Sequence, residues 1–133
     1  MAPMSEATTP PTQSAGMDPL EAGRMALARH LWPEAFEQLT AADRDGQLSG
    51  ADLESLALAA FFAAKADAAL EVKERAFKAY LAEGDDIRAA YLAIDVARTY
   101  GFQGKTSIAA AWGSRAAGII GSDGDTYAHG YLA

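Results

Sequence analysis

The sequence contains no cysteine among its 133 residues. Disulfide bonds and thiolate-ligated metal sites are therefore excluded, and the composition suits a protein of the reducing cytoplasm, which is the location we expect. The chain also has no apolar run near the roughly 18 residues that a membrane-spanning helix needs. We therefore predict a soluble protein with no membrane partner.

Basic residues are few, since 11 lysines and arginines stand against 18 acidic residues and the net charge is -7. A nucleic-acid-binding surface needs clustered basic side chains, so we expect no direct nucleic-acid contact. The two histidines, His30 and His129, have no metal-ligand spacing around them. Asp123 and Asp125 lack the glycine and the glutamate of a calcium-binding loop. We predict no metal site.

Catalytic patterns are missing as well. The sequence shows no set of serine, histidine and aspartate, and no isolated carboxylate pair, of the kind that nucleophilic or acid-base catalysis needs. Between Gly101 and Thr106 the two glycines are too close together for a phosphate-binding loop, and no strand precedes them, so a turn between helices is the better interpretation. We predict that the protein is not an enzyme and binds no cofactor.

The N-terminal segment differs in composition from the rest of the chain. Residues 1–17 hold three of the five prolines and no lysine or arginine. Such a segment cannot bury enough apolar surface to offset its ordering entropy, so we predict a disordered tail. Residues 18–133 are predicted to form one helical-repeat domain.

Residues 18–43 have the pattern of two helices folded against each other. Asp18 suits the capping position of a helix and Pro19 its first position. Pro33 is tolerated only in a first turn, so a second helix is predicted to begin beside it. The connection between them is short, so the two helices must be antiparallel. We expect Trp32, at the start of the second helix, to lock this hairpin.

Two further hairpins are predicted at about residues 49–83 and 85–120, with the start of another helix at 126–133. Ser49 and Asp85 suit helix N-termini, and Gly84 suits a helix end. Ala42 and Ala76 occupy equivalent places 34 residues apart, and Ala116 follows after 40. We expect the chain to end inside a fourth repeat, and its uncapped apolar face to permit pairing with a second copy.

This spacing resembles the tetratricopeptide (TPR) pattern, in which small residues let two helices approach closely and a large aromatic begins the second helix. The chain departs from the pattern at Pro19, where the family has a bulky residue, and in lacking the closing proline. The resemblance implies an all-α fold of antiparallel helical hairpins stacked as a TPR-like right-handed solenoid, with about six helices and a partial seventh. The positions that carry it are Gly23, Trp32, Ala35, Leu39, Ala42, Ala69, Ala76, Trp112 and Ala116.

The order of segments resembles one TPR-like group in particular, the arrays attached to bacterial LuxR-type helix-turn-helix transcription regulators and to some nucleotide cyclases. The likeness rests on the first hairpin, on ALEVKERAFKAY from Ala69, on IAAAWGSRAAGII from Ile108 and on the final HGYLA. The resemblance implies a non-catalytic protein-protein interaction module with a regulatory or signalling role. The partner would be a protein or a peptide.

The family's inward-facing positions, carried onto this chain, give a candidate concave binding surface. Its members come from the first helix of each hairpin and are Arg24, Leu27, Glu54, Leu58, Phe61, Phe62, Tyr91, Ile94 and Arg98. Aromatic and arginine side chains contribute most to binding energy. Two alternatives stay open: Phe61 and Tyr91 belong to the core, or Phe61, Phe62 and Tyr91 form the wall of a stand-alone sensor for an apolar small molecule.

Overall fold

A computed structural model describes residues 16–46 and 48–121 of the chain. This part is all-α, as predicted, and its six helices are α2 (Pro19–Ala28), α3 (Trp32–Arg44), α4 (Gly50–Phe62), α5 (Ala66–Ala82), α6 (Asp86–Phe102) and α7 (Thr106–Gly121). The tail predicted over residues 1–17, apart from its last two residues, lies outside the described residues. The helix predicted at 126–133 lies outside them too.

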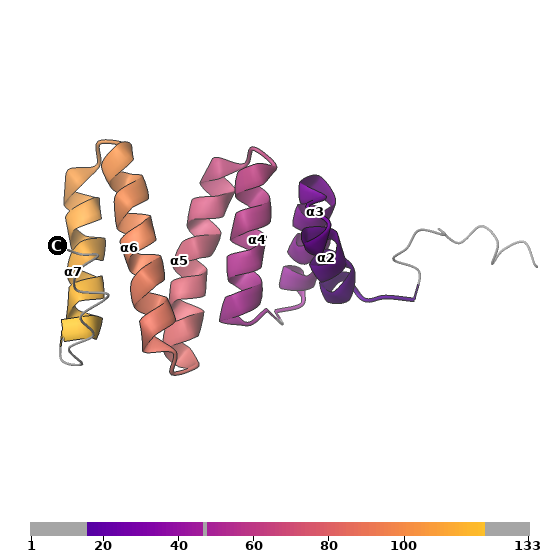
Figure 1. The fold of residues 1–133 in the computed structure, drawn as a ribbon, viewed down its shortest axis with the longest axis horizontal. Helices are drawn as coiled ribbons and strands as arrows, with labels where there is room; N and C mark the ends of the chain where they lie inside the picture. The colour runs from indigo at the N-terminus through magenta and orange to yellow at the C-terminus, as the bar shows by residue number, and fades with distance from the viewer. Residues whose placement is uncertain (1–15, 47, 122–133) are drawn as a thin grey trace, which may run out of the picture.

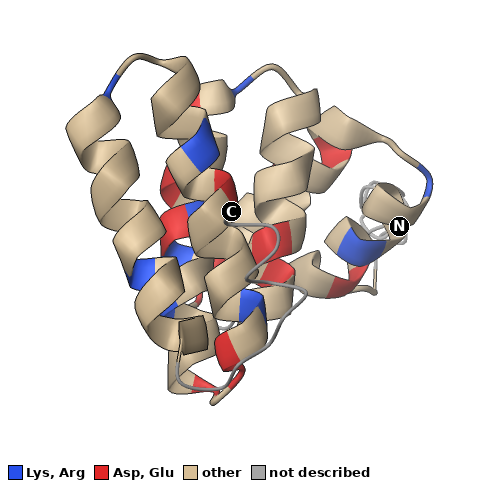
Figure 2. Cartoon of the chain, turned by 60° about the vertical axis from the view of Figure 1, so that its left-hand side comes forward, with Lys and Arg blue, Asp and Glu red and all other residues tan. Residues whose placement is uncertain are grey.

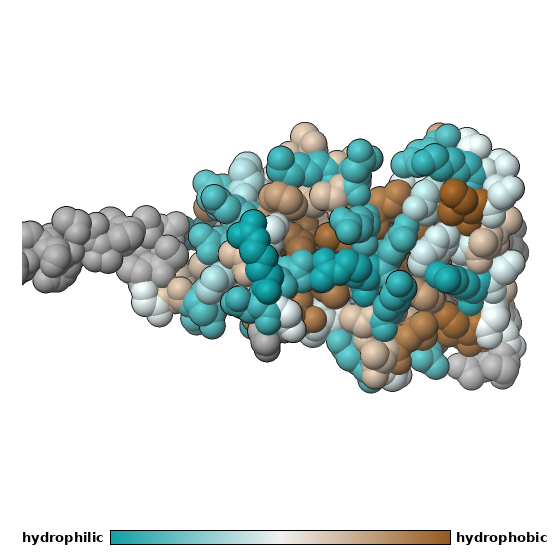
Figure 3. All heavy atoms as spheres, turned by 180° about the vertical axis from the view of Figure 1, so that it is seen from behind, coloured by the Kyte–Doolittle hydropathy of each residue, from teal (hydrophilic) through white to brown (hydrophobic). Residues whose placement is uncertain are grey.

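The helices form three antiparallel hairpins, α2–α3, α4–α5 and α6–α7, which lie side by side in chain order (Figure 1). Each helix packs against the helix before it and the helix after it. The right-handed solenoid twist stays a prediction. From behind, hydrophilic side chains cover much of the array and the apolar patches between them are separate (Figure 3).

The helix starts follow from local capping. The Asp18 carboxylate accepts a hydrogen bond from the backbone N–H of Glu21 at 2.8 Å. The Ser49 hydroxyl accepts one from the N–H of Asp52 at 3.1 Å, and Asp85 caps α6 in the same way. Pro33 lies in the first turn of α3. These side chains satisfy N–H groups that have no partner within their own helix, so the predicted starts are confirmed.

Five helices are followed by a residue in the left-handed backbone region. Three of these residues are glycines, Gly46, Gly84 and Gly104, but the other two are His30, with φ of 59°, and Ala64, with φ of 64°. After α2, α4, α5 and α6 the next residue's N–H returns to a carbonyl five residues earlier, as from Lys65 to Ala60 at 2.8 Å. This pattern is a Schellman motif, which closes the helix and reverses the chain direction.

The small residues predicted at the helix crossings are buried. Ala35, Ala42, Ala69, Ala76 and Ala116 are all at most 4% exposed. Gly23 permits the closest approach, because a Cβ atom there would lie 2.7 Å from two side-chain carbons of Leu39, which is itself fully buried. The predicted close packing of the first hairpin is therefore present.

The large apolar residues agree only in part with the predicted pattern. Trp32 is half-buried, and it stacks on Phe62 at 4.7 Å, so it joins the first hairpin to the second rather than filling the core of its own. Ile108, the first residue of the segment IAAAWGSRAAGII, is 44% exposed, whereas Ile120 at its end is fully buried. Trp112 is buried as predicted and meets Phe77 edge-on at 5.1 Å.

Candidate functional site

An open groove of about 420 Å³ lies between α4 and α6, with one residue of α5 contributing to it. Its lining residues are Ala51, Glu54, Ser55, Leu58, Lys73, Arg88, Leu92 and Asp95. Two of the predicted surface residues, Glu54 and Leu58, line it, and both come from α4. The groove is thus formed by the first helices of two successive hairpins, and a concave TPR-type binding surface stays a prediction.

Ion pairs and hydrogen bonds hold the charged side chains of the groove. Lys73 Nζ lies 2.7 Å from Asp95 Oδ2, which links α5 to α6. The Tyr80 hydroxyl donates to Glu54 Oε1 at 2.7 Å and accepts a longer hydrogen bond of 3.4 Å from Arg88 Nη1. The lining therefore presents basic and acidic side chains close to each other.

Tyr80 of α5 connects the two walls of the groove, because its hydroxyl contacts Glu54 of α4 and Arg88 of α6. It is only 2% exposed, and its ring lies against Gly50, where a Cβ atom would come within 2.7 Å of the ring carbon Cδ1. Burial, together with the hydrogen bond to the Glu54 carboxylate, raises the pKa of Tyr80. The phenol therefore stays protonated at neutral pH and keeps donating to Glu54.

The apolar part of the groove consists of one protruding and one buried leucine. Leu58 is 43% exposed, whereas Leu92 is only 4% exposed. Sequence reasoning missed Leu92 together with Lys73, Arg88 and Asp95. On α6, however, positions 88, 92 and 95 follow the spacing of one helical face, and that spacing could have identified them.

The other predicted surface residues lie elsewhere. Phe61 and Phe62 are about half exposed at the end of α4, with Phe62 against Trp32. Ile94 is buried in the main core, and Tyr91 packs against the cluster around Ile120. Leu27 packs beside the buried Ala26, Ala35 and Ala59, and Arg98 is exposed on α6. The structure therefore does not gather the nine predicted residues on one surface.

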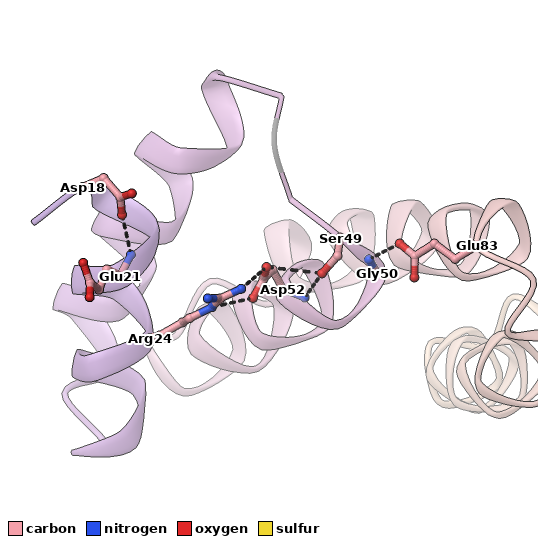
Figure 4. A network of polar contacts seen from close by, with 7 residues as sticks. All are labelled: Asp18, Glu21, Arg24, Ser49, Gly50, Asp52 and Glu83. Carbon is pink, nitrogen blue, oxygen red and sulfur yellow. Dashed lines mark hydrogen bonds and ion pairs between the residues drawn. The ribbon is translucent and has the colours of Figure 1, made fainter.

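Arg24 has an intramolecular partner, which Figure 4 shows. Its guanidinium donates to both carboxylate oxygens of Asp52, at 2.8 and 3.1 Å, and this pairing raises the pKa of Arg24. Asp52 is 7% exposed and also contacts the Ser49 hydroxyl. The backbone N–H of Gly50 donates to Glu83 at 2.8 Å. The start of α4 is thereby tied to both α2 and the end of α5.

Within residues 16–46 and 48–121, no three or more histidine, aspartate or glutamate residues are grouped so that they could hold a metal ion. In the same ranges no helix combines the length and the apolar character required to cross a membrane. Asp123, Asp125 and His129 lie outside the described residues. Gly101 and Thr106, considered above for phosphate binding, lie at the end of α6 and the start of α7.

No family model, no curated protein and no solved structure matches the chain. The groove's own geometry is therefore what supports a function.

Proposed function

We propose that the protein is a non-catalytic protein-protein interaction module of TPR-like type that binds a polypeptide segment in the groove between α4 and α6. The observation that carries this proposal is the groove lining, in which an exposed leucine lies among charged residues of both signs. Such a lining suits a peptide, which offers apolar and charged side chains together.

Leu58 would supply the apolar contact. It is 43% exposed, and because only this part remains to be covered, its burial contributes about 0.6–1.3 kcal/mol, so one apolar side chain of a partner can anchor there. Glu54 and Arg88 would select charges on either side of that anchor. Such rim charges contribute more to specificity and association rate than to affinity. The expected partner segment has an apolar residue flanked by a basic and an acidic one.

The resemblance to LuxR-type and cyclase-linked arrays supports a wider role as the regulatory or sensory part of a bacterial signalling or transcription-regulator protein. The alternative is a sensor that holds an apolar small molecule between its helices. That alternative receives less support, because Phe61 and Phe62 lie at the end of α4 whereas Tyr91 packs beside Ile120. Pairing with a second copy through the last hairpin stays a further proposal.

A peptide-display selection against the full chain tests the proposal. Selected peptides should carry the pattern described above, and Leu58→Asp should weaken their binding about tenfold or more, because it removes the apolar anchor and places a carboxylate where the peptide would exclude water. Leu81→Asp is the matched control, since Leu81 is similarly exposed, at 38%, but does not line the groove. If no peptide is enriched, or if Leu58→Asp binds as well as the wild type, the proposal is wrong.

A further inference from the structure

Two turns of the array share a sequence pattern, phenylalanine followed three residues later by lysine. Phe62 ends α4 and Lys65 precedes α5, while Phe102 ends α6 and Lys105 precedes α7. The α4–α5 and α6–α7 turns lie at the same end of the array (Figure 1). The stacking of Trp32 on Phe62 brings the α2–α3 turn beside them. We name these three turns the aromatic edge.

The aromatic edge exposes large apolar side chains to an unusual degree. Phe102 is 85% exposed, and Phe61 and Phe62 are 56% and 52% exposed. Leu31 and Ile108, which border the first and third turns, are 40% and 44% exposed. Single exposed apolar residues are common on soluble proteins, but several at one end of a helical array mark an interaction surface.

Basic residues accompany these apolar ones. Lys65 Nζ lies 5.4 Å above the ring of Phe36, and Lys105 Nζ lies 5.8 Å above the ring of Tyr100. The two turns at the top of Figure 2 are each marked by a basic residue. Arg29 and His30 are exposed at the α2–α3 turn. Two exposed carboxylates, Glu34 and Asp67, lie in the first turns of α3 and α5. With Arg29, Lys65 and Lys105 against them, the aromatic edge combines apolar tips with an excess of basic side chains.

At the opposite end, the α5–α6 turn is acidic. It contains Glu83, Asp85 and the first residue of α6, Asp86, whereas in the α3–α4 turn Asp45 follows Arg44, the last residue of α3. The 17 residues of α5 place the two ends about 25 Å apart, which is more than twice the Debye length at physiological salt. The net charge of -7 therefore does not prevent the aromatic edge from approaching a negative surface.

We propose that the aromatic edge docks on the surface of a membrane that contains anionic lipids. The phenylalanines at the tips enter the region between headgroups and acyl chains, and Lys65 and Lys105 contact the negative headgroups. A lipid surface fits better than a protein partner, because the apolar side chains project from separate turns along an edge. This contact is independent of the groove function. It departs from the expectation of no membrane partner, which rested on the lack of a membrane-spanning run, because docking at a membrane surface needs no spanning helix.

Vesicle flotation with the full chain tests this proposal. Vesicles of equal parts phosphatidylcholine and phosphatidylserine should carry the protein upward, whereas vesicles of phosphatidylcholine alone should carry much less. Added salt should weaken the binding, because the lysine contribution is screened. On binding, the fluorescence of a Trp112→Phe variant should shift to shorter wavelength, since Trp32 then reports on the edge alone.

Single-residue variants test whether the aromatic edge, rather than another part of the surface, binds the vesicles. Phe102→Ser should lower the partition coefficient about tenfold or more, and Lys105→Glu about fivefold or more. Leu81→Ser and Lys78→Glu are the matched controls outside the aromatic edge and should bind as the wild type does. Equal binding to both vesicle types, or loss in the controls but not in the edge variants, would overturn the proposal. Failure to bind either kind of vesicle would also overturn it, even if the aromatic edge were found to bind a protein.

Discussion

Replacing Gly23 by alanine should destabilise the protein, although alanine is the better helix former. Gly23 lies inside α2, where the change contributes about 1 kcal/mol of helix propensity. The new Cβ atom would lie 2.7 Å from two carbons of Leu39 and 3.2 Å from its backbone nitrogen. Ordinary carbon contacts are about 3.5–4.0 Å long, and Leu39 is fully buried and cannot move into solvent.

Overpacking of this kind costs typically about 1–3 kcal/mol, and contact with two side-chain carbons and the backbone at once places Gly23→Ala toward the upper end. After the gain in propensity, we expect a net loss of about 1–2 kcal/mol in the free energy of unfolding. Gly113→Ala is the control. Gly113 lies inside α7, and apart from the backbone of α7 and the adjacent residues a methyl group there would meet no atom within 4 Å, so this change should stabilise by about 0.5–1 kcal/mol. Urea unfolding followed by far-ultraviolet circular dichroism measures both. Equal stabilisation by the two variants would refute the close approach of α2 and α3.

Three single positions provide further tests. Ala64→Gly should raise the free energy of unfolding by about 0.5–1 kcal/mol, because φ of 64° strains alanine but not glycine. Thermal unfolding measures this change, and an unaltered or lowered melting temperature would contradict the prediction. Trp32→Ala should lower the free energy of unfolding by about 1–3 kcal/mol, less than for a fully buried tryptophan, and should change the near-ultraviolet spectrum; a loss above about 4 kcal/mol would show that Trp32 is a core residue. The hydrogen bonds from Arg75 lower the pKa of Asp43, so their contribution is present above the unfolded pKa near 3.9 and is lost as pH falls through the lower folded value. The stability difference between wild type and Arg75→Met should therefore shrink in acid, and a difference that is constant with pH would contradict this role of the pair.

The helix ends are the part of the fold that is most predictable from sequence. Capping by Asp18, Ser49 and Asp85, and the stop at Gly84, depend on side chains and backbone within a few residues. Burial of the crossing alanines is predictable for a related reason, since their spacing repeats along the helix. The stop at Ala64 was not predictable from its residue type, because alanine rarely adopts a left-handed backbone.

The candidate site was less predictable, because it depends on how separate hairpins face each other. Successive residues on a helix point about 100° apart, so a small error in register moves a residue to another face. On α6 the assignment carried over from the family selected Ile94, which is buried, and missed Asp95, which lines the groove. Arg24 was expected to face a partner, but its ion pair with Asp52 joins residues 28 apart in the chain. No local pattern indicates such a contact.

Amide chemical-shift mapping of the full chain with a selected peptide tests the groove proposal most directly. We expect the largest changes on the two walls, around Leu58 of α4 and Arg88 and Asp95 of α6, with little change at Leu81. The Tyr80 amide should also respond, because its side chain connects the walls. Changes confined to the turns near Phe102, or the absence of changes along α4 and α6, would contradict binding in the groove.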